Sequence, residues 1–422
     1  MERVISLFLV LHVAGAARLS GTDEPSAPAN RPPSVVVVMP GPDESDTGAI
    51  QRCIDSGAAE VIVPFAGRPW VVEPLRLRDR LTLRLEPGVR LEAKPGGYRK
   101  TTDAMFVGHE VSSVAIIGYG ASIRMRKLDY GGPDYDRGEW RHGIDLRGGR
   151  DVTIEGLSIQ ETGGDAVYIG PTWDERRIPC HGITVRNCTM ERNYRQGISI
   201  VSGEHIRLDN CVLRGTGGTN PQAGIDLEPG NSLDLLSDIH ISNCAAIGNI
   251  GSGFIVSLPR LTSHSKPVSV LFERCLASGS QSHLVQTSIG VDPPVGRVVF
   301  RDCVFEDTPK AGLRGIWKSA PEDFSLHFEN CKWSKVASNY NRAPFAFNLD
   351  SGDRASARGG IYFSDCYMFD DRARELFDLA GASGVDIRGR LRVITPTQSA
   401  LGTRKPHPEL SIEYVETLDH RE

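Results

Sequence analysis

The sequence predicts an all-β protein whose chain winds into a parallel β-helix, a solenoid of stacked coils. Three observations predict this fold. First, a short motif ending in Cys recurs at intervals of 23, 33, 31, 28, 28 and 35 residues. Second, each interval contains β-like runs separated by Gly bends. Third, no helical periodicity occurs inside the repeats. Periods of this size are typical of repeat architectures. Because β-rich units stack at about 4.8 Å, each repeat is interpreted as one coil.

The N-terminal segment has the pattern of a secretory signal peptide. A weakly basic start, an apolar run from Ile5 to Val13 and the small residues at 14–16 define an expected signal over 1–16. We therefore expect a secreted or periplasmic protein. The next segment, 17–45, is rich in Pro and Ser and is predicted to be a disordered linker. No later stretch reaches the roughly 18 apolar residues of a membrane span, so we expect no membrane association.

One short helix is predicted at the start of the solenoid, which is expected to occupy 46–394. The sequence DTGAIQRCIDSG offers Asp46 or Thr47 as N-cap and Gly57 as C-terminal stop, with an apolar face between them. Such a helix would cap the open end of the solenoid. Runs of alternating apolar residues follow as strands. The pattern is lost over 395–422, which is expected to form a tail or an end cap.

Seven of the nine cysteines occupy the same place in the repeat. We interpret them as a reduced, buried ladder, because Cys is usually buried and fills a narrow interior well. An Asn precedes four of them and is expected at the inner corner of the coil, bonded to the Asn of the next coil. Cys53 and Cys180 lie outside the ladder, and whether they pair stays open. The ladder consists of Cys188, Cys211, Cys244, Cys275, Cys303, Cys331 and Cys366, and the Asn residues are Asn187, Asn210, Asn243 and Asn330.

Neither a metal site nor a nucleic-acid surface is predicted. The chain has no CxxC or HxxxH pair, and these are spacings in which zinc ligands commonly occur. Its formal charge of −5 argues against a strongly basic nucleic-acid binder. We expect a monomer that requires no cofactor, and Ca²⁺ stays open as an addition.

One strand of each coil carries most of the outward polar residues. Its copies read HGIDL, DAVYI, QGISI, AGIDLE and GFIV, and in each the apolar residues alternate with a residue that faces away from the core. The longest loops, at 129–139, 171–181, 215–222 and 258–267, flank this strand and are expected to form a groove. The outward positions are Asp145, Tyr168, Ser199, Asp226 and Ile255.

The passage DTGAIQRCID…VIVPFAGRPWVVEPLRLRDRLTLRLEPGVRLEA, followed by GIDL, GGDAVYIG and RQGISIVSG, resembles the pectin-lyase-like superfamily, and most of all its polygalacturonase branch. The resemblance covers about 46–388 in general pattern and is specific over 140–228. It implies a right-handed parallel β-helix with catalysis on successive coils of one outward strand. The motifs of that branch are Asn-Thr-Asp-Gly, Asp-Asp, Gly-His-Gly and Arg-Ile-Lys.

The match to these motifs is partial. His142 holds the place of the first carboxylate, and Gly164-Asp165 keeps one carboxylate of the Asp pair. Arg195-Gln196-Gly197 lacks the His of the third motif, and Asp226-Leu227-Glu228 replaces the cationic pair. Acidic residues there would repel a uronate unless a cation bridged them. The resemblance therefore points either to a neutral sugar or to a bridging Ca²⁺.

Asp165 and Asp226 are the expected acid and base. They lie two coils apart, about 10 Å between backbones, and side-chain reach can bring the carboxyls into the ~6.5–9.5 Å range of an inverting glycosidase. His142, one coil from Asp165, is the expected orienter or alternative proton carrier. The residues expected to bind substrate are Asp145, Tyr168, Tyr194, Arg195, Gln196, Trp173 and Glu228.

We therefore expect a secreted carbohydrate-active enzyme that cleaves a polysaccharide or glycan, and specifically a glycoside hydrolase. Two alternatives stay open. A polysaccharide lyase on the same fold would use a base such as His142, with Ca²⁺ neutralising the substrate charge. A non-catalytic β-helix would only bind glycan, and an outward Asp can equally be a solvated residue without a catalytic role.

Overall fold

The computed structural model describes most of the chain after Pro33, and the chain divides into two units, 1–32 and 33–422. The expected signal peptide, 1–16, and the first part of the expected linker lie outside the described residues. All described residues belong to the second unit. They are 34–290, 292–316, 324–339, 342–348, 358–372, 374–379, 385–395 and 410–416.

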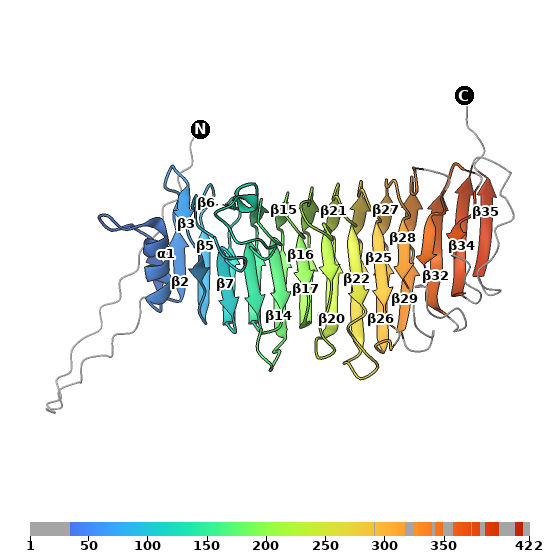
Figure 1. Ribbon diagram of the computed structural model, residues 1–422, viewed down its shortest axis with the longest axis horizontal. Helices are drawn as coiled ribbons and strands as arrows, with labels where there is room; N and C mark the ends of the chain where they lie inside the picture. Colours follow the sequence, from blue (N-terminus) through green and yellow to red (C-terminus); the bar gives the residue numbers. More distant parts are fainter. Residues whose placement is uncertain are drawn as a thin grey trace, which may run out of the picture. The chain divides into compact units, whose positions relative to one another are not determined.

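Parallel strands stack in three rows along successive coils, so the structure confirms an all-β parallel β-helix (Figure 1). Most coils contribute a strand to each row. The first row contains β1 (Val35–Val37), β2 (Glu60–Val63), β5 (Leu81–Leu85), β8 (Ser112–Ile117), β11 (Arg150–Glu155), β14 (Cys180–Arg186), β17 (Gly203–Asp209), β20 (Leu236–Ser242), β23 (Val268–Glu273), β26 (Gly296–Arg301), β29 (Phe324–Glu329), β32 (Arg358–Phe369), β34 (Val385–Thr395) and β35 (Leu410–Glu416).

The second row lies beside the first and joins it at the long strand β32. It contains β3 (Trp70–Val72), β6 (Arg90–Ala93), β9 (Ser122–Arg124), β12 (Ser158–Gln160), β15 (Thr189–Glu191), β18 (Val212–Arg214), β21 (Ala245–Ile247), β24 (Leu276–Ser278), β27 (Val304–Glu306) and β30 (Lys332–Ser334).

The third row forms a separate sheet, and this sheet carries the predicted site. A short 3-10 helix, η1 (Asp129–Gly131), lies in the loop between β9 of the second row and β10 of the third. The row contains β4 (Leu75–Arg76), β7 (Phe106–His109), β10 (Ile144–Arg147), β13 (Val167–Gly170), β16 (Ile198–Ile200), β19 (Ile225–Leu227), β22 (Phe254–Leu258), β25 (Val285–Ile289), β28 (Leu313–Ile316), β31 (Phe345–Asn348) and β33 (Phe377–Asp378).

The predicted capping helix is α1 (Asp46–Asp55), which contacts β2, β3 and β4 at the N-terminal end of the coils (Figure 1). Its N-cap is Ser45 and not Asp46 or Thr47, because the Ser45 hydroxyl accepts the N–H of Gly48 at 3.0 Å. Asp46 is the first helical residue, and its carboxylate instead pairs with Arg68 at 2.7 Å. Gly57, with φ of 82°, follows the helix as expected.

Both expected ends of the solenoid need correction. β1 lies inside the expected linker, 17–45, and pairs with β2 through Val35, Val36 and Val37. β35 lies inside the expected tail, 395–422, and pairs in parallel with β34. Both segments pair in parallel with the strand of the adjacent coil, which composition alone does not reveal.

The cysteine ladder is confirmed. All nine cysteines are buried and none is in a disulfide, Cys53 and Cys180 included. In the ladder each thiol lies near backbone carbonyls of its own or the preceding coil. For example, Cys331 Sγ lies 3.3 Å from Phe300 O, and Cys366 Sγ lies 3.2 Å from Phe328 O. The cysteine ladder therefore contributes to packing of the interior.

The Asn residues beside the ladder lie at an exposed outer corner, not at the inner corner that was expected. Asn187, Asn210 and Asn330 have φ of 56°, 50° and 51°, the left-handed region that Asn tolerates better than most residues. The expected stacking occurs once, since Asn210 Nδ2 donates to Asn187 Oδ1 at 2.8 Å. Asn330 donates instead to Asp302 Oδ1 of the neighbouring coil, at 2.6 Å.

The interior of the later coils contains a second ladder, of phenylalanines. Phe272, Phe300, Phe328 and Phe363 stack in sequence, with ring centroids 4.5, 5.2 and 5.5 Å apart. The repeat spacing places one Phe above the next, so equivalent residues of successive coils pack face to face with offset.

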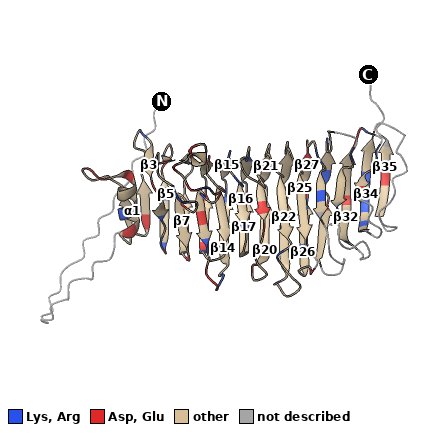
Figure 2. Cartoon of the chain, viewed as in Figure 1, with Lys and Arg blue, Asp and Glu red and all other residues tan. Residues whose placement is uncertain are grey.

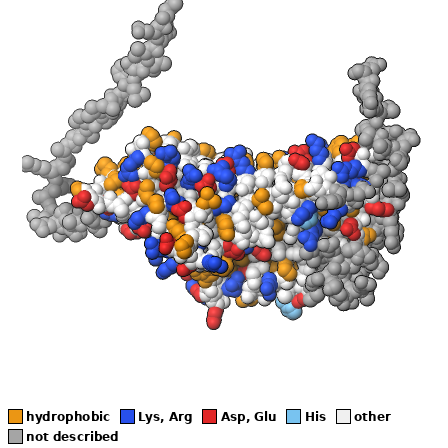
Figure 3. All heavy atoms as spheres, turned by 45° about the horizontal axis from the view of Figure 1, so that its top comes forward, with side chains coloured by type: hydrophobic (Ala, Val, Ile, Leu, Met, Phe, Trp, Pro, Cys, Tyr) orange, Lys and Arg blue, Asp and Glu red, His pale blue; other side chains and the backbone are white. Residues whose placement is uncertain are grey.

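The surface carries both signs of charge. Figure 2 shows Lys, Arg, Asp and Glu spread along the coils, and the face in Figure 3 shows the two signs interspersed over the N-terminal coils. In the described part of the chain, no helix has the length and apolar character to cross a membrane.

Candidate active site

The expected outward column on the third row is confirmed by the strand register. Asp145 pairs with Tyr168, Tyr168 with Ser199, Ser199 with Asp226, and Asp226 with Ile255. Because side chains alternate along each strand, these residues all face away from the coil interior. Asp165, three residues before Tyr168, lies two coils from Asp226, as expected.

The proposed acids and His142 do not line an open groove. His142, Asp165 and Asp226 are each 0% exposed. The sequence pattern shows that a residue points out of the coil, but it does not show what covers the residue. In this structure Arg195 contacts Asp165, and the segment before β10 packs against Gly164 beside it.

The segment before β10 is part of this cover. Arg141 is buried and donates to the backbone carbonyls of Tyr98, Arg99 and Asp136 at 2.6 to 2.8 Å, which fixes the segment against the coil. A Cβ at Gly164 would lie 2.7 Å from the carbonyl oxygen of Glu139. A second Asp beside Asp165 therefore has no room, which explains why only one carboxylate of the family pair is present.

Arg195 lies at the centre of the site and contacts three acids from three different parts of the chain. Its Nη1 lies 3.4 Å from Asp165 Oδ2, its Nη2 lies 3.1 Å from Glu228 Oε2, and its Nε lies 3.5 Å from Glu139 Oε1. Burial alone would lower the pKa of Arg195, but the charges of Asp165, Asp226, Glu228 and Glu139 outweigh burial and raise it. The Arg195 guanidinium therefore stays protonated.

Asp226 is the most perturbed acid of the site. Its Oδ2 accepts from Gln196 Nε2 at 2.7 Å, and Gln196 Oε1 in turn accepts the N–H of Ala223 at 2.8 Å, which fixes the orientation of the amide. Burial, followed by the neighbouring charge of Glu228, raises the pKa of Asp226 well above its usual range despite the nearby Arg195. Asp226 thus keeps its proton at a pH where an exposed Asp is ionised.

His142 is a neutral imidazole. Its Nδ1 accepts the backbone N–H of Asp165 at 3.0 Å, so the proton of the ring is on Nε2. Burial lowers the pKa of His142, although the charges of Asp165 and Asp145 oppose this shift. The ring stacks on Tyr168 with centroids 4.8 Å apart. The expected closeness to Asp165 is confirmed, since Asp165 Oδ2 lies 3.5 Å from Nδ1.

A second group of polar residues continues along the same sheet. Asp145, buried, lies 3.1 Å from both Arg147 Nε and His109 Nε2. Burial would raise the pKa of Asp145, but hydrogen bonding to His109 and the nearby positive charges outweigh burial and lower it. The Arg147 guanidinium lies over the rings of Tyr168 and Trp173 at 4.2 and 4.0 Å, and Trp173 is 59% exposed.

Tyr194 packs against a loop, 215–222. Its carbonyl oxygen accepts the N–H of Thr219 at 3.0 Å, and its ring occupies the space beside Gly218. This contact positions the loop next to the site.

Sequence reasoning did not identify Glu139, Arg147 and His109. For two of them a signal exists, because Arg147 is two residues after Asp145 on the same face of β10, and His109 pairs with Arg147 in the register of β7 and β10. Glu139 has no such signal, since it belongs to an irregular loop.

Polar atoms without a hydrogen-bond partner cluster at this site. Within the described residues, His142 Nε2, Asp165 Oδ1, Ser199 Oγ and Asp226 Oδ1 are all buried and unpaired. They belong to four consecutive coils, of β10, β13, β16 and β19. Unsatisfied buried polar atoms are rare and costly in folded proteins, so this face of the sheet is suited to a ligand rich in donors and acceptors.

A cation bridging Asp165 and Glu228 would compete with a residue already there. The Arg195 guanidinium lies between the two carboxylates and supplies the positive charge.

Comparison with known proteins supports the fold. The family model described as the right handed beta helix region matches residues 137–258. A curated relative, the uncharacterized SPbeta prophage-derived protein YorA of Bacillus subtilis (strain 168), is 28% identical over 190 residues, which is 42% of this chain and 32% of YorA. The chain thus matches about a third of the length of that relative.

Two solved structures have folds similar to that of this chain. The A-module of the mannuronan C-5 epimerase AlgE4 of Azotobacter vinelandii has a TM-score of 0.60 and 14% identity, over 92% of this chain and 97% of the module. The family 28 exopolygalacturonase of Yersinia enterocolitica has a TM-score of 0.54 and 13% identity, over 92% of this chain and 79% of that chain. Likeness at such low identity establishes the fold. The chain has a right-handed parallel β-helix fold.

Proposed function

We propose that this protein cleaves glycosidic bonds in a polysaccharide, as a glycoside hydrolase with Asp226 as proton donor and Asp165 as base. The observation that carries this proposal is the difference between the two carboxyl environments. Burial beside Glu228 raises the pKa of Asp226, whereas Asp165 lies next to the Arg195 cation. A carboxyl that keeps its proton, together with a second carboxyl on the same face, is the usual basis of acid and base roles in glycosidases.

In this reaction Asp165 takes a proton from a water molecule as the water oxygen bonds to the anomeric carbon. The bond from that carbon to the bridging oxygen breaks, and Asp226 gives its proton to the departing oxygen. Ser199 and His142 offer a hydroxyl and an Nε2–H to sugar hydroxyls, which would satisfy the unpaired atoms of this face.

The substrate would approach across Arg195. Of the three acids that contact its guanidinium, Glu228 has the most accessible side chain, at 43% exposed. Because Arg195 lies over Asp165, we infer that a bound glycan takes over the contacts of the guanidinium to Glu139 and Glu228, while Arg195 keeps its contact to Asp165. The exposed ring of Trp173, further along the same sheet, offers a stacking surface for a sugar.

The comparisons support the substrate class but not the reaction. The names of the two similar structures assign one to mannuronan and the other to polygalacturonate, which are both polysaccharides. A shared fold hosts different chemistries, so the residues decide the reaction.

A basic cavity on the same sheet favours an acidic polysaccharide. The cavity has a volume of about 250 Å³ and includes His283, Lys310 and Arg314 among its lining residues. Burial and the charges of Arg314 and Lys310 lower the pKa of His283 to about 3. The register places Arg314 three coils from Asp226, roughly 14 Å along the sheet. A chain of sugars could occupy both places.

The test is incubation of the full chain with a panel of neutral and acidic polysaccharides, following new reducing ends and the ultraviolet absorbance of unsaturated uronates. Asp165→Asn and Asp226→Asn are expected to abolish reducing-end formation. Asp151→Asn, an exposed Asp on the first row, is the matched control and is expected to retain it. Arg314→Ala is expected to lower cleavage of acidic polymers only, whereas exposed Arg297→Ala should leave cleavage unchanged.

Other outcomes would replace the proposal. Absorbance that is lost on chelation would identify a Ca²⁺-dependent lyase. Glycan binding without bond cleavage on any polymer would identify a binding protein.

A further inference from the structure

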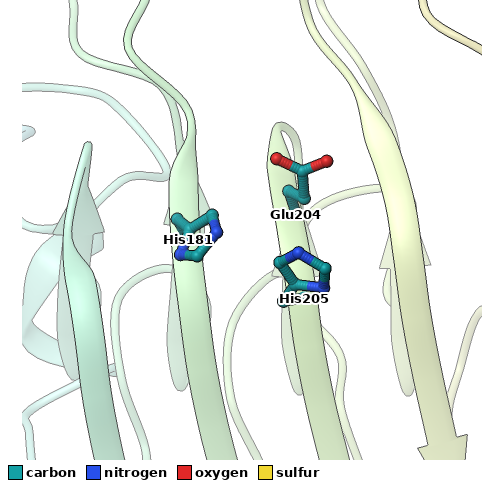
Figure 4. A group of neighbouring side chains, drawn as sticks. All are labelled: His181, Glu204 and His205. Carbon is teal, nitrogen blue, oxygen red and sulfur yellow. The ribbon is translucent and has the colours of Figure 1, made fainter.

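We propose that His181, Glu204 and His205 form a binding site for a divalent transition-metal ion of the Zn²⁺ type, separate from the acids around Arg195. Ligand atoms of the three side chains all lie within 4.8 Å of one another. Figure 4 shows the two rings and the carboxyl group side by side on neighbouring strands. The site belongs to the first row, at the beginning of β14 and β17.

Coil stacking creates this group. His181 of β14 pairs with Glu204 of β17, so the two residues are direct neighbours although they are 23 positions apart in the chain. His205 has φ of 55°, which breaks the usual alternation of side chains along a strand. The consecutive residues Glu204 and His205 can then both bind the same metal ion. No short sequence motif marks such ligands, which is why the sequence predicted no metal site.

The surrounding residues orient the ligands. Asp238 Oδ2 lies 2.6 Å from His205 Nδ1, which leaves Nε2 of that ring for a metal. Arg207 Nη2 also lies 2.6 Å from Asp238 Oδ2, so this carboxylate is held behind the His205 ring. A carboxylate behind a ligating His is a common outer contact in metal sites and raises the basicity of the ring. Ser237 Oγ donates to Glu204 Oε1 at 3.3 Å, leaving the second oxygen available.

The positive charges of nearby arginines limit the affinity of this site for a metal cation. Arg150 Nη1 lies 3.4 Å from His181 Nδ1, and Arg207 pairs with Asp238 at 2.6 Å. Arg150 is exposed, so its side chain can turn away when an ion enters. Its positive charge nevertheless disfavours a cation, and we expect that removing it tightens binding.

The ligand set selects the kind of metal. Two imidazoles and one carboxylate suit Zn²⁺ and neighbouring transition metals, whereas Ca²⁺ and Mg²⁺ prefer oxygen ligands alone. Three protein ligands at a half-exposed corner leave a fourth position for water. A metal there would link the coils of β14 and β17 and, through Asp238, the coil of β20.

The experiment is titration of the chelator-treated full chain with ZnCl₂ by calorimetry, together with the melting temperature with and without zinc. We expect one zinc ion per chain and a rise in melting temperature, because an ion that binds only the folded state stabilises it. The double variant His181→Ala/His205→Ala is expected to lose both effects. His240→Ala is the matched control, since His240 is a half-buried His on the adjacent β20, and should retain both.

Two finer measurements address the role of the surroundings. Asp238→Asn is expected to weaken zinc binding by roughly 10- to 100-fold, the effect typical of outer contacts. Arg150→Ala is expected to strengthen binding. CaCl₂ in place of ZnCl₂ should have no effect on the melting temperature. Zinc binding that persists in the double variant, or no saturable binding in the unaltered chain, would overturn the proposal, and neither result bears on glycan cleavage.

Discussion

The chemistry of individual residues in this protein depends more on their burial and their neighbours than on residue type. Asp165 and Asp226 are both fully buried, yet one lies against a guanidinium and the other against an amide and a second carboxyl. Their chemical difference thus comes from neighbours contributed by other coils. The same holds for His142, because burial lowers its pKa and its Nδ1 accepts a backbone N–H from the next coil.

The raised pKa of Asp226 predicts a pH dependence of stability. Because the folded state favours the protonated carboxyl, the stabilisation is complete below the unfolded pKa of about 3.9 and is lost as pH rises through the raised folded pKa. Asp226→Asn cannot ionise, so its melting temperature is expected to fall less than that of the unaltered chain as pH rises above the unfolded pKa of Asp. Parallel melting curves for the two proteins would show that Asp226 does not titrate in this way.

Removal of Arg195 is expected to destabilise the protein at neutral pH. Arg195→Ala leaves Asp165 buried without a cation, and the free energy of unfolding should fall by about 3 kcal/mol in urea titrations. The loss should shrink in acid, where the carboxyls protonate. Arg186→Ala, which removes an exposed pair with Glu155, is the control and should cost about 1 kcal/mol or less. Equal losses in both variants would mean that Arg195 is not a buried counter-ion.

The coil, with its strands and corners, depends on a few backbone positions that repeat. The corner before each ladder Cys has a left-handed backbone in successive coils, at Asn187, Asn210, Asn243, Arg274, Asp302, Asn330 and Asp365. Asn, Asp and Gly adopt this conformation more readily than other residues. The Asn that was expected to act as a side-chain ladder therefore serves mainly to turn the chain.

A substitution at one corner can test this interpretation. Asn330→Val should lower the free energy of unfolding by about 1–2 kcal/mol, because a β-branched residue is strained at positive φ. Asn330→Gly should be closer to the unaltered chain, although it also loses the bond to Asp302. Thr189→Val, on the strand β15, is the control for adding Val to the surface. If Val and Gly at 330 cost the same, backbone conformation is not the reason for Asn.

At the scale of the whole molecule, the described residues of unit 33–422 form a solenoid whose core grows with every coil. The interior contains ladders of Cys and Phe that run from coil to coil, and no disulfide links any of the cysteines. Each coil contacts mainly its neighbours, so stability arises from repeated, similar interfaces.

The ladder predicts the reactivity of the thiols. In the native protein a thiol reagent such as 5,5′-dithiobis(2-nitrobenzoate) should react slowly, because all nine cysteines are buried. After denaturation without a reducing agent, all nine should react at once. Fewer than nine reactive thiols under those conditions would reveal a disulfide and contradict the ladder of free cysteines.

Local patterns in the chain were sufficient for the coil repeat, the capping helix, the Cys ladder and the outward column from Asp145 to Ile255. They were sufficient because strand alternation and coil stacking relate residues by fixed spacing. They could not reveal that β35 continues the stack, nor that Glu139 reaches Arg195 from an irregular loop.

Only the tertiary structure shows which side chains are buried, which keep their proton and which residues contact one another. The segment before β10 covers Asp165, a neighbouring acid raises the pKa of Asp226, and the backbone at His205 brings two consecutive residues to His181. Each of these effects depends on atoms from segments distant in sequence, and the free energy of a buried charge depends on all of them together. The repeat can thus be deduced from spacing, whereas the chemistry of the site depends on what covers each coil.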